Sequence, residues 1–338
     1  MSESKGKRIK WADVLRAFAL YSVILAHLGS FSQRISLFCF GYVMQLFFFV
    51  SGLFASSYRK LDFPALLKKL IVHLLVPHII LSAVNIAYAA FRRIPNWQNG
   101  IMQCVLAIRN KIMFPVLWYL PCLIVMTLVY WCLCRIIRND MLRLVLCLAV
   151  SMAFRIFKEP SQWFWSSDSA MMFLFYYALG DILMPVLKKI PASDTPVWKK
   201  ILAGLVALLC LFPVIKSYEI YNSETPVLFD RILSVRDVQI FTFVSSTAAI
   251  LLFVALSYLT QNSEMLQTIG RRSMLLFAIQ GPSVDLFNWL LWQIGVTWIP
   301  RFDWQVLFLG AARLIFSCFV FGGPVYWLLD KLGLKKNS

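Results

Sequence analysis

Apolar stretches long enough to cross a bilayer recur along this whole 338-residue chain, of which 60% is hydrophobic and 14% charged. A helix needs about 20 predominantly apolar residues to span the bilayer core, which offers no water to unpaired backbone groups. The chain is therefore predicted to be an all-α integral membrane protein. We expect about ten transmembrane helices, at residues 11–30, 36–57, 70–91, 113–134, 141–157, 169–187, 200–216, 239–260, 273–294 and 305–329.

The segments between these helices are too short to form a second domain. Residues 1–338 are thus expected to be one polytopic membrane domain with short cytoplasmic tails at 1–10 and 331–338. The net charge of +17 does not indicate nucleic-acid binding, because Lys and Arg fall in short clusters between the helices. About twice as many lie on the side of the termini, and such an excess marks the cytoplasm. We predict a multi-pass protein of the cell (plasma or inner) membrane with both termini in the cytoplasm and no nucleic-acid partner.

The eight cysteines lie mostly inside or beside the expected helices and form no CxxC pair. Cysteine in such places is usually a small apolar packing residue. We therefore expect neither disulfides nor a metal site.

Two ionisable residues, Arg16 and His27, lie in the first expected helix, separated by the ten residues AFALYSVILA. Eleven residues of α-helix rise about 16 Å and return to within about 20° of the same face. Arg16 is thus predicted near one membrane surface and His27 toward the other. Ionisable side chains in membrane helices are costly and usually functional. An arginine binds phosphate, and a neutral imidazole takes a proton or acts as a nucleophile. Snorkelling and helix packing are the structural alternatives.

Three further residues are expected to support this pair. Asp13, three residues before Arg16, can orient the guanidinium through a charge-assisted hydrogen bond. Ser51 and Gly52 interrupt the aromatic run LFFFVSGLF at 46–54. Small residues let helices or ligands approach closely. Ser51 is expected to face a cavity beside the first helix, although plain helix packing explains this pair of small residues equally well.

A basic stretch leads into the third expected helix. Lys68, Lys69 and His73, which lies one turn after Lys69, form a candidate anion site beside Arg16. The alternative is that this charge only sets the topology. His78 follows Pro77 and is expected to be structural.

Candidate acceptor-binding residues come from two later segments. Trp118 and Tyr119 in LWYLPCL (117–123) can stack on a sugar ring, with an interfacial aromatic belt as the alternative for both. Gln280 is the third candidate, and Ser51 or Gln280 can stabilise an oxyanion. Other polar residues inside expected helices are Asp181, Asp285 and Arg313.

The segment WADVLRAFALYSVILAH, which contains Arg16 and His27, resembles the acyltransferase 3 family of membrane O-acyltransferases. LFFFVSGLF is similar to the second-helix pattern of that family, and LWYLPCL to its tryptophan-aromatic-leucine motif. The stretch from Lys68–Lys69 to Pro77 is similar to its basic start of the third helix, and YYALGDIL (176–183) to its glycine-containing sixth helix. SMLLFAIQGP (273–282) lies where many members carry a histidine, which Gln280 replaces here.

This resemblance implies transfer of an acyl group, usually from cytoplasmic acetyl-CoA, to a hydroxyl of an extracytoplasmic or membrane-linked glycan or glycolipid. His27 and Arg16 would be the catalytic pair. Arg16, Lys68, Lys69 and His73 would bind the CoA phosphates. Some members carry a fused SGNH esterase-like domain. We expect the stand-alone form, in which any later transfer needs a separate partner.

Several alternatives stay open at this point. A glycan or lipid transporter or flippase can use Arg16 and His27 for binding or proton coupling. An acyltransferase can act with a lipid, peptide or succinyl-type substrate. His27 can be a general base or an acyl carrier, and the chain can be monomeric or a homo-oligomer.

Overall fold

The computed structural model describes residues 9–109, 111–112, 116–157, 163–189, 196–222, 235–295, 300 and 302–323. Within these ranges the side chains of 216–222, 235–241 and 322 are not described. All regular structure in the described residues is helical. The expected tails lie outside the description, except for Ile9 and Lys10.

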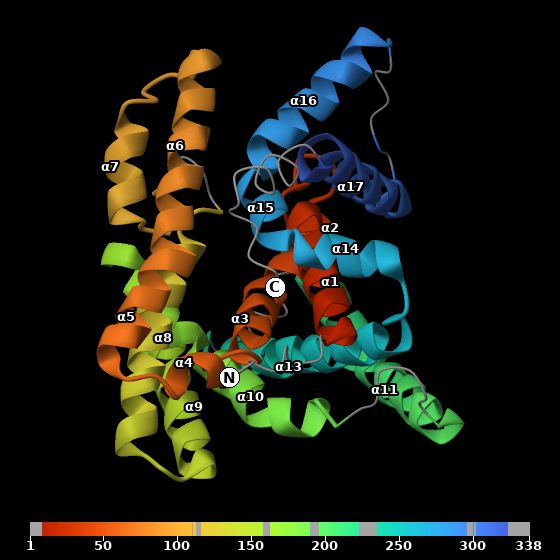
Figure 1. The fold of residues 1–338 in the computed structure, drawn as a ribbon. Helices are drawn as coiled ribbons and strands as arrows, with labels where there is room; N and C mark the ends of the chain where they lie inside the picture. The colour runs from red at the N-terminus through yellow and green to blue at the C-terminus, as the bar shows by residue number, and fades with distance from the viewer. Residues whose placement is uncertain are drawn as a thin grey trace, which may run out of the picture.

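Many of the helices follow one another after short turns, and the π-helical turn Ile71–Leu75 connects two of them directly (Figure 1). In chain order the elements are α1 (Lys10–Ala26), α2 (Gln33–Phe40), α3 (Val43–Gly52), α4 (Ser56–Arg59), α5 (Phe63–Leu70), η1 (Ile71–Leu75), α6 (Val76–Phe91), α7 (Asn99–Leu106), α8 (Tyr119–Ile136), α9 (Asp140–Phe157), η2 (Phe164–Ser166), α10 (Ser167–Leu187), α11 (Val197–Asn222), α13 (Val235–Leu259), α14 (Glu264–Arg271), α15 (Ser273–Ala278), α16 (Gln280–Gln293), α17 (Asp303–Ser317) and η3 (Cys318–Gly322).

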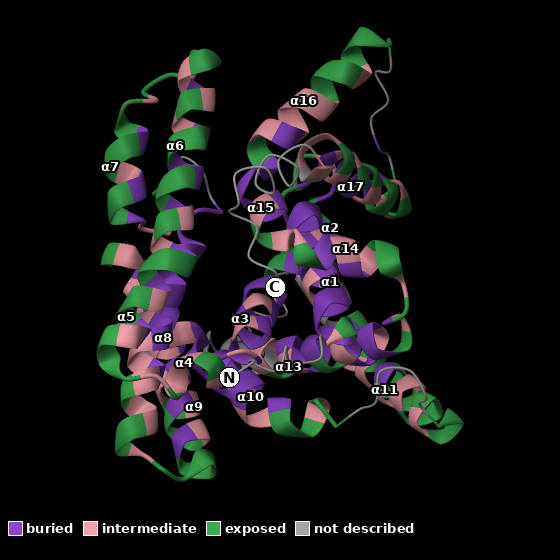
Figure 2. Ribbon diagram, viewed as in Figure 1, coloured by how far each residue is buried: buried purple, intermediate pink, exposed green. Residues whose placement is uncertain are grey.

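The first helix, α1, is the centre of the packing. It contacts α2, α3, α13, α14, α15 and α17, and nearly all of its residues are buried. Figure 2 shows α1 and α3 mostly in the colour of buried residues, whereas α7 and the outer part of α16 are largely exposed. Lipid can also cover an apolar helix, so the packing of these neighbours, and not the hydropathy of α1, places it in the interior.

Glycines permit the closest helix contacts. A Cβ on Gly52 of α3 would collide with the backbone carbonyl of Tyr177 in α10, and one on Gly180 would collide with that of Phe49. Where α14 meets α1, a Cβ on Gly270 would collide with the Asp13 carbonyl. Small residues let membrane helices pack backbone to backbone. Gly52 therefore lets α3, which carries Ser51, pack directly against α10.

His73 lies in a π-helical turn between two helices. The helices α5 and α6 continue into one another through η1 at Ile71–Leu75. Pro77 has no N–H for the carbonyl of His73, four residues before it, and a proline inside a helix disturbs this ladder. The extra residue of a π-turn is a common way to absorb such a disturbance.

Among the residues that the structure describes, seven helical runs are long and apolar enough to cross a membrane: Gln33–Gly52, Phe63–Phe91, Tyr119–Ile136, Phe164–Leu187, Val197–Ile215, Thr242–Leu259 and Asp303–Phe321. They correspond to seven of the ten expected spans. The other three are helical but different in character. The helix α1 has 17 residues, α9 carries Asp140, Arg143 and Arg155, and the expected span 273–294 consists of two shorter helices.

Two expected continuous helices are interrupted. The expected span 36–57 is divided between α2 and α3, with Gly41 and Tyr42 at the junction. The expected span 273–294 is divided at Ile279 into α15 and α16. The first helix also ends earlier than expected, because Ala26 is its last residue and His27 is its C-cap. His27 therefore follows the last residue of α1 and is exposed, rather than lying within a helical span.

The glycine contact between α3 and α10 predicts a matched pair of substitutions. Gly52→Ala should lower stability by about 1–3 kcal/mol, because the added methyl group forces two backbones apart. Gly204→Ala in α11 should be neutral or slightly stabilising, since its Cβ meets nothing within 4 Å. Thermal unfolding of the two purified variants checks this, and equal unfolding temperatures would contradict the close contact.

Candidate functional site

Two cavities flank the central helix. The larger, which we call the arginine cavity, has a volume of about 450 Å³. Its polar lining residues are Arg16, Ser51, Tyr58, His73, Tyr119, Thr127, Tyr177, Arg271 and Ser273. The smaller, the histidine cavity, has a volume of about 270 Å³. Its polar lining residues are His27, Asn85, Tyr88, Gln280, Asp285 and Arg313.

Arg16 is held in the arginine cavity from two sides. Its Nη1 lies 3.3 Å from Oδ1 of the buried Asp13, the contact that their spacing predicts. The guanidinium carbon lies 4.4 Å from the ring centroid of Phe54. A guanidinium held by a carboxylate and an aromatic face keeps a defined direction, since both contacts depend on its plane. Arg16 thus presents an oriented positive charge to the cavity.

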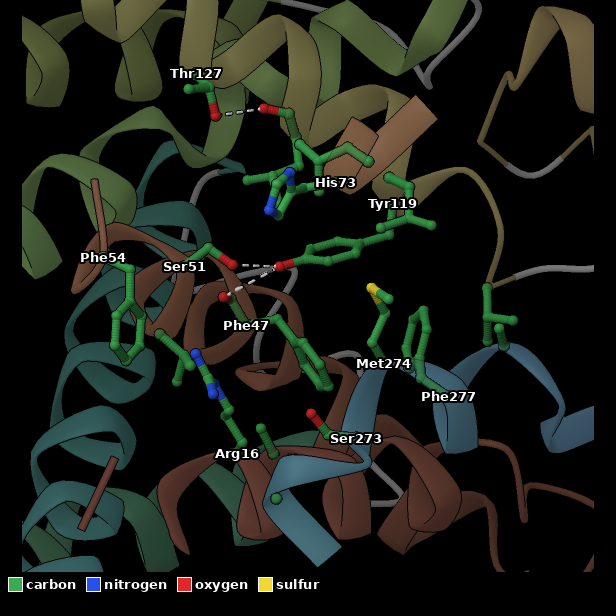
Figure 3. A pocket seen from close by; sticks show the side chains of 18 of the residues that line it. Arg16, Phe47, Ser51, Phe54, His73, Tyr119, Thr127, Ser273, Met274 and Phe277 are labelled. Atoms are coloured by element: carbon green, nitrogen blue, oxygen red, sulfur yellow. Dashed lines mark hydrogen bonds between the residues drawn. The ribbon is translucent and has the colours of Figure 1, made fainter. Parts of the chain in front are cut away.

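A buried hydrogen-bond pair lies between Arg16 and His73 (Figure 3). The Tyr119 hydroxyl lies 2.6 Å from the Ser51 hydroxyl, where either group can donate, and 3.3 Å from the Phe47 carbonyl oxygen, which accepts. Tyr119 therefore belongs to the arginine cavity and braces α8 against α3. Ser51 also lines the arginine cavity and not the histidine cavity.

The side of the cavity opposite Arg16 is formed by the α4–η1 region. Nδ1 of His73 donates to the Lys69 carbonyl at 3.1 Å. Nζ of Lys69 donates to the Ser57 carbonyl at 3.0 Å and lies 4.4 Å from the ring centroid of Tyr58. Burial raises the pKa of the Tyr58 hydroxyl, so it stays a neutral donor. Lys69 thus contacts the lining residue Tyr58 but does not itself line the cavity.

His27 lines the histidine cavity with one ring nitrogen fixed. Its Nδ1 lies 2.8 Å from the Val23 carbonyl oxygen, which can only accept. Nδ1 therefore carries the proton, and the lone pair of the neutral ring is on Nε2. The ring edge also packs against Phe40, with centroids 5.7 Å apart. This arrangement gives a neutral His27 a base at Nε2.

The two cavities meet at two shared lining residues, Val116 and Ala278. Both are buried. The Ala278 carbonyl accepts a hydrogen bond from Asn85 at 3.1 Å, which ties α15 to α6 at this point. We call Val116 and Ala278 the neck. Arg16 and His27, which the sequence predicts on one helix stripe, therefore lie in adjoining cavities.

Not all predicted residues lie in these cavities. Lys68 is exposed and lines neither one. Trp118 is buried outside both linings, with the Arg109 guanidinium 5.0 Å from its ring. Asp181 is also elsewhere, bound to Arg59 at 3.0 Å and to the Tyr130 hydroxyl at 2.9 Å. Gln280 lines the histidine cavity, apart from the two aromatic residues with which the sequence grouped it.

The structure adds residues to the site that the sequence did not single out. Arg271 joins Arg16 and His73 in the arginine cavity. Its position two residues before the segment SMLLFAIQGP was the available signal, but on sequence grounds it counted only toward topology. Asn85 and Tyr88 carry no motif, and only the packing of α6 against α15 and α16 brings them to His27. Among the described residues, no group of three or more His, Cys, Asp or Glu gathers as metal ligands.

Comparison with known families gives one match over nearly the whole chain. The family model of the acyltransferase 3 type, described as an acyltransferase domain, matches residues 9–328. Comparisons with curated proteins and with solved structures gave no match.

The cationic lining of the arginine cavity predicts phosphate binding. Inorganic pyrophosphate should raise the unfolding temperature of the purified protein, because guanidinium groups pair with phosphate oxygens. Arg16→Gln and Arg271→Gln should each weaken this effect, with an apparent Kd about tenfold higher. Arg93→Gln, at an exposed arginine that lines neither cavity, is the charge-matched control. Equal stabilisation of all four proteins would rule out the site.

Proposed function

Because the chain belongs to the acyltransferase 3 family, we propose that it is a membrane O-acetyltransferase. It moves an acetyl group from cytoplasmic acetyl-CoA to a hydroxyl of an extracytoplasmic or membrane-linked glycan. Acetyl-CoA is a cosubstrate here, and no metal takes part. The protein works as a multi-pass protein of the cell membrane.

The observation that supports this proposal most is the pair of adjoining cavities. One is lined by cations and the other contains the imidazole, and they share Val116 and Ala278. A donor with a phosphorylated end and a long thin arm needs this kind of site. Charge is held at one end, and the reacting group lies at the other. The rise of about 16 Å between Arg16 and His27 along α1 matches an extended arm.

The residues of the arginine cavity fit the phosphates of CoA. Arg16 and Arg271 supply two guanidinium groups, and His73 a third nitrogen-bearing side chain. Lys69, which contacts the ring of Tyr58, adds a positive charge next to the cavity. Lys68 is exposed, which suits a first contact with an incoming anion rather than a place in the bound site. Asp13 serves as the positioning residue for Arg16.

His27 is the proposed catalytic residue, by one of two routes. Its Nε2 removes the proton from the acceptor hydroxyl, or it accepts the acetyl group and passes it on. The hydrogen bond from Nδ1 to Val23 suits both routes, because it leaves the lone pair on Nε2 and fixes the ring. The Gln280 amide, in the same cavity, remains the candidate for stabilising the oxyanion.

The proposed orientation places both termini and the arginine cavity on the cytoplasmic side. The excess of Lys and Arg on that side supports it. The seven long apolar helical runs, together with α1, α9 and the α15–α16 pair, would then make ten crossings. His27 and the histidine cavity would face the outer side, where the glycan is.

The different roles proposed for Arg16 and His27 predict that substitutions can separate acetyl-CoA binding from acetyl transfer. His27→Ala should keep acetyl-CoA binding and lose acetyl transfer by about 10²–10⁴-fold, the range for a lost general base. Arg16→Gln should raise the Kd for acetyl-CoA by about tenfold or more. Binding of labelled acetyl-CoA and release of CoA thiol, measured in nanodiscs with a crude periplasmic glycan fraction as acceptor, check both.

Transfer that survives in His27→Ala would contradict the assigned role of His27. A wild type that does not bind acetyl-CoA would contradict the acyltransferase proposal itself. It would favour the transporter or flippase, for which flux of a labelled glycan across a vesicle membrane is the readout.

The neck predicts a second substitution that slows acetyl transfer without changing the affinity for acetyl-CoA. Ala278→Leu should narrow the junction between the cavities, slow acetyl transfer by about tenfold or more, and leave the Kd for acetyl-CoA within about twofold. Ala87→Leu, at an exposed position of α6, is the matched control. If Ala278→Leu transfers acetyl groups at the wild-type rate, the donor arm does not pass the neck.

A further inference from the structure

The histidine cavity contains a buried cation without a carboxylate partner. Arg313 of α17 is 5% exposed, and no carboxylate of the described residues lies within 4 Å of it. Its Nη2 donates to Oδ1 of Asn288 at 2.9 Å, while its Nε is buried without a partner in the described part of the chain. The rings of Phe31 and Phe287 flank the guanidinium, with centroids 5.5 and 6.0 Å away.

An arginine in this state is costly unless something pairs with it. A charged group within a membrane protein normally has a counter-ion or lines a substrate path. Asp285 lines the same cavity, but its carboxylate accepts from the Tyr88 hydroxyl at 2.7 Å and forms no ion pair with Arg313. Arg313 and Asp285 thus line one small cavity without forming an ion pair with each other. Arg313 is therefore available to an anionic group of a ligand.

The remaining polar atoms of this cavity are mainly hydrogen-bond acceptors. Both amide hydrogens of Asn85 go to the carbonyls of Leu81 and Ala278, so its Oδ1 is left to accept. Oε1 of Gln280 is buried and unpartnered among the described residues, and Gln280 is 8% exposed. With Asp285 and Nε2 of His27, four accepting groups line the cavity. Several acceptors together suit a ligand rich in hydroxyl donors.

We propose that the acceptor is an anionic carbohydrate, whose carboxylate or phosphate binds Arg313 while its hydroxyls donate to Asp285, Gln280 and Asn85. This inference rests on the proposed acetyl transfer and deepens it. It names the acceptor class and makes Arg313 a specificity-determining residue. A neutral sugar leaves the guanidinium unpaired and desolvated, and so binds less well.

The test compares three probes that differ in charge. Methyl β-glucuronide carries a carboxylate, glucose 1-phosphate carries a phosphate, and methyl β-glucoside is neutral. Binding of each to the full-length protein in nanodiscs is measured by calorimetry without acetyl-CoA. Acetyl transfer to each is then measured with acetyl-CoA. We expect at least one anionic probe to bind about tenfold or more tightly than the neutral one, and the better anionic probe identifies the group.

Arg313→Gln should abolish this preference by lowering affinity for the anionic probe about tenfold or more, with little change for the neutral probe. Arg313→Lys should retain part of it, and Arg93→Gln, the exposed control, all of it. Asp285→Asn should weaken all three probes together, because it alters a hydroxyl acceptor rather than the anion partner. Arg313→Gln should also unfold at or above the wild-type temperature, since it removes an unpaired buried charge.

Three results would overturn the proposal. The first is a wild type that shows no preference for either anionic probe. The second is an Arg313→Gln protein that loses affinity for the neutral and the anionic probes equally, as expected if Arg313 only donates hydrogen bonds to groups that all three probes share. The third is a marked fall in its unfolding temperature, as expected if Arg313 only holds α17 in place. Because probe binding is measured without acetyl-CoA, a failure of the acetyl-transfer proposal is seen separately, as absent acetyl-CoA binding.

Discussion

Where α14 meets α1, the backbones of Gly270 and Asp13 are too close to admit a Cβ. The same is true of Gly52 and Gly180 at the contact between α3 and α10. Lipid tails are as apolar as the side chains, so helices in a membrane associate through such close packing rather than through burial of apolar surface from water. The arginine cavity depends on these contacts. The α14 contact brings Arg271 beside Arg16, and the α3 contact brings Ser51 within reach of Tyr119.

The second principle of the structure is the separation of charge along α1. Arg16, His73 and Arg271 line one cavity, while His27 shares the other with several hydrogen-bond acceptors and one arginine. Each ionisable group in an apolar surrounding raises the free energy of the folded protein unless it is paired. Asp13 pairs with Arg16, and Tyr88 donates to Asp285. His27, His73 and Arg313 also line the cavities, where a bound ligand can add to the contacts that the protein supplies.

The sequence predicted the residues of the arginine cavity better than those of the histidine cavity. Asp13 contacts Arg16 as their spacing predicts, because residues three or four apart on a helix share a face. Ser51 and His73, which the sequence placed near Arg16, line the arginine cavity with it. Trp118 was grouped with the acceptor site, but it packs against Arg109 instead. Asn85, Arg271 and Arg313 join the site from distant segments. No periodicity within one helix indicates which helices become neighbours.

The sequence by itself determined that this chain is built from apolar membrane helices and that Arg16 and His27 both lie in the first of the predicted spans. Hydropathy and helix geometry are local properties, and they follow from residue types and spacing alone. Only the tertiary structure decided that the helix ends at His27, that two expected helices are interrupted, and that two cavities meet at Val116 and Ala278. These features arise from contacts between segments far apart in the chain, since backbone groups freed at a helix break must find partners in neighbouring elements.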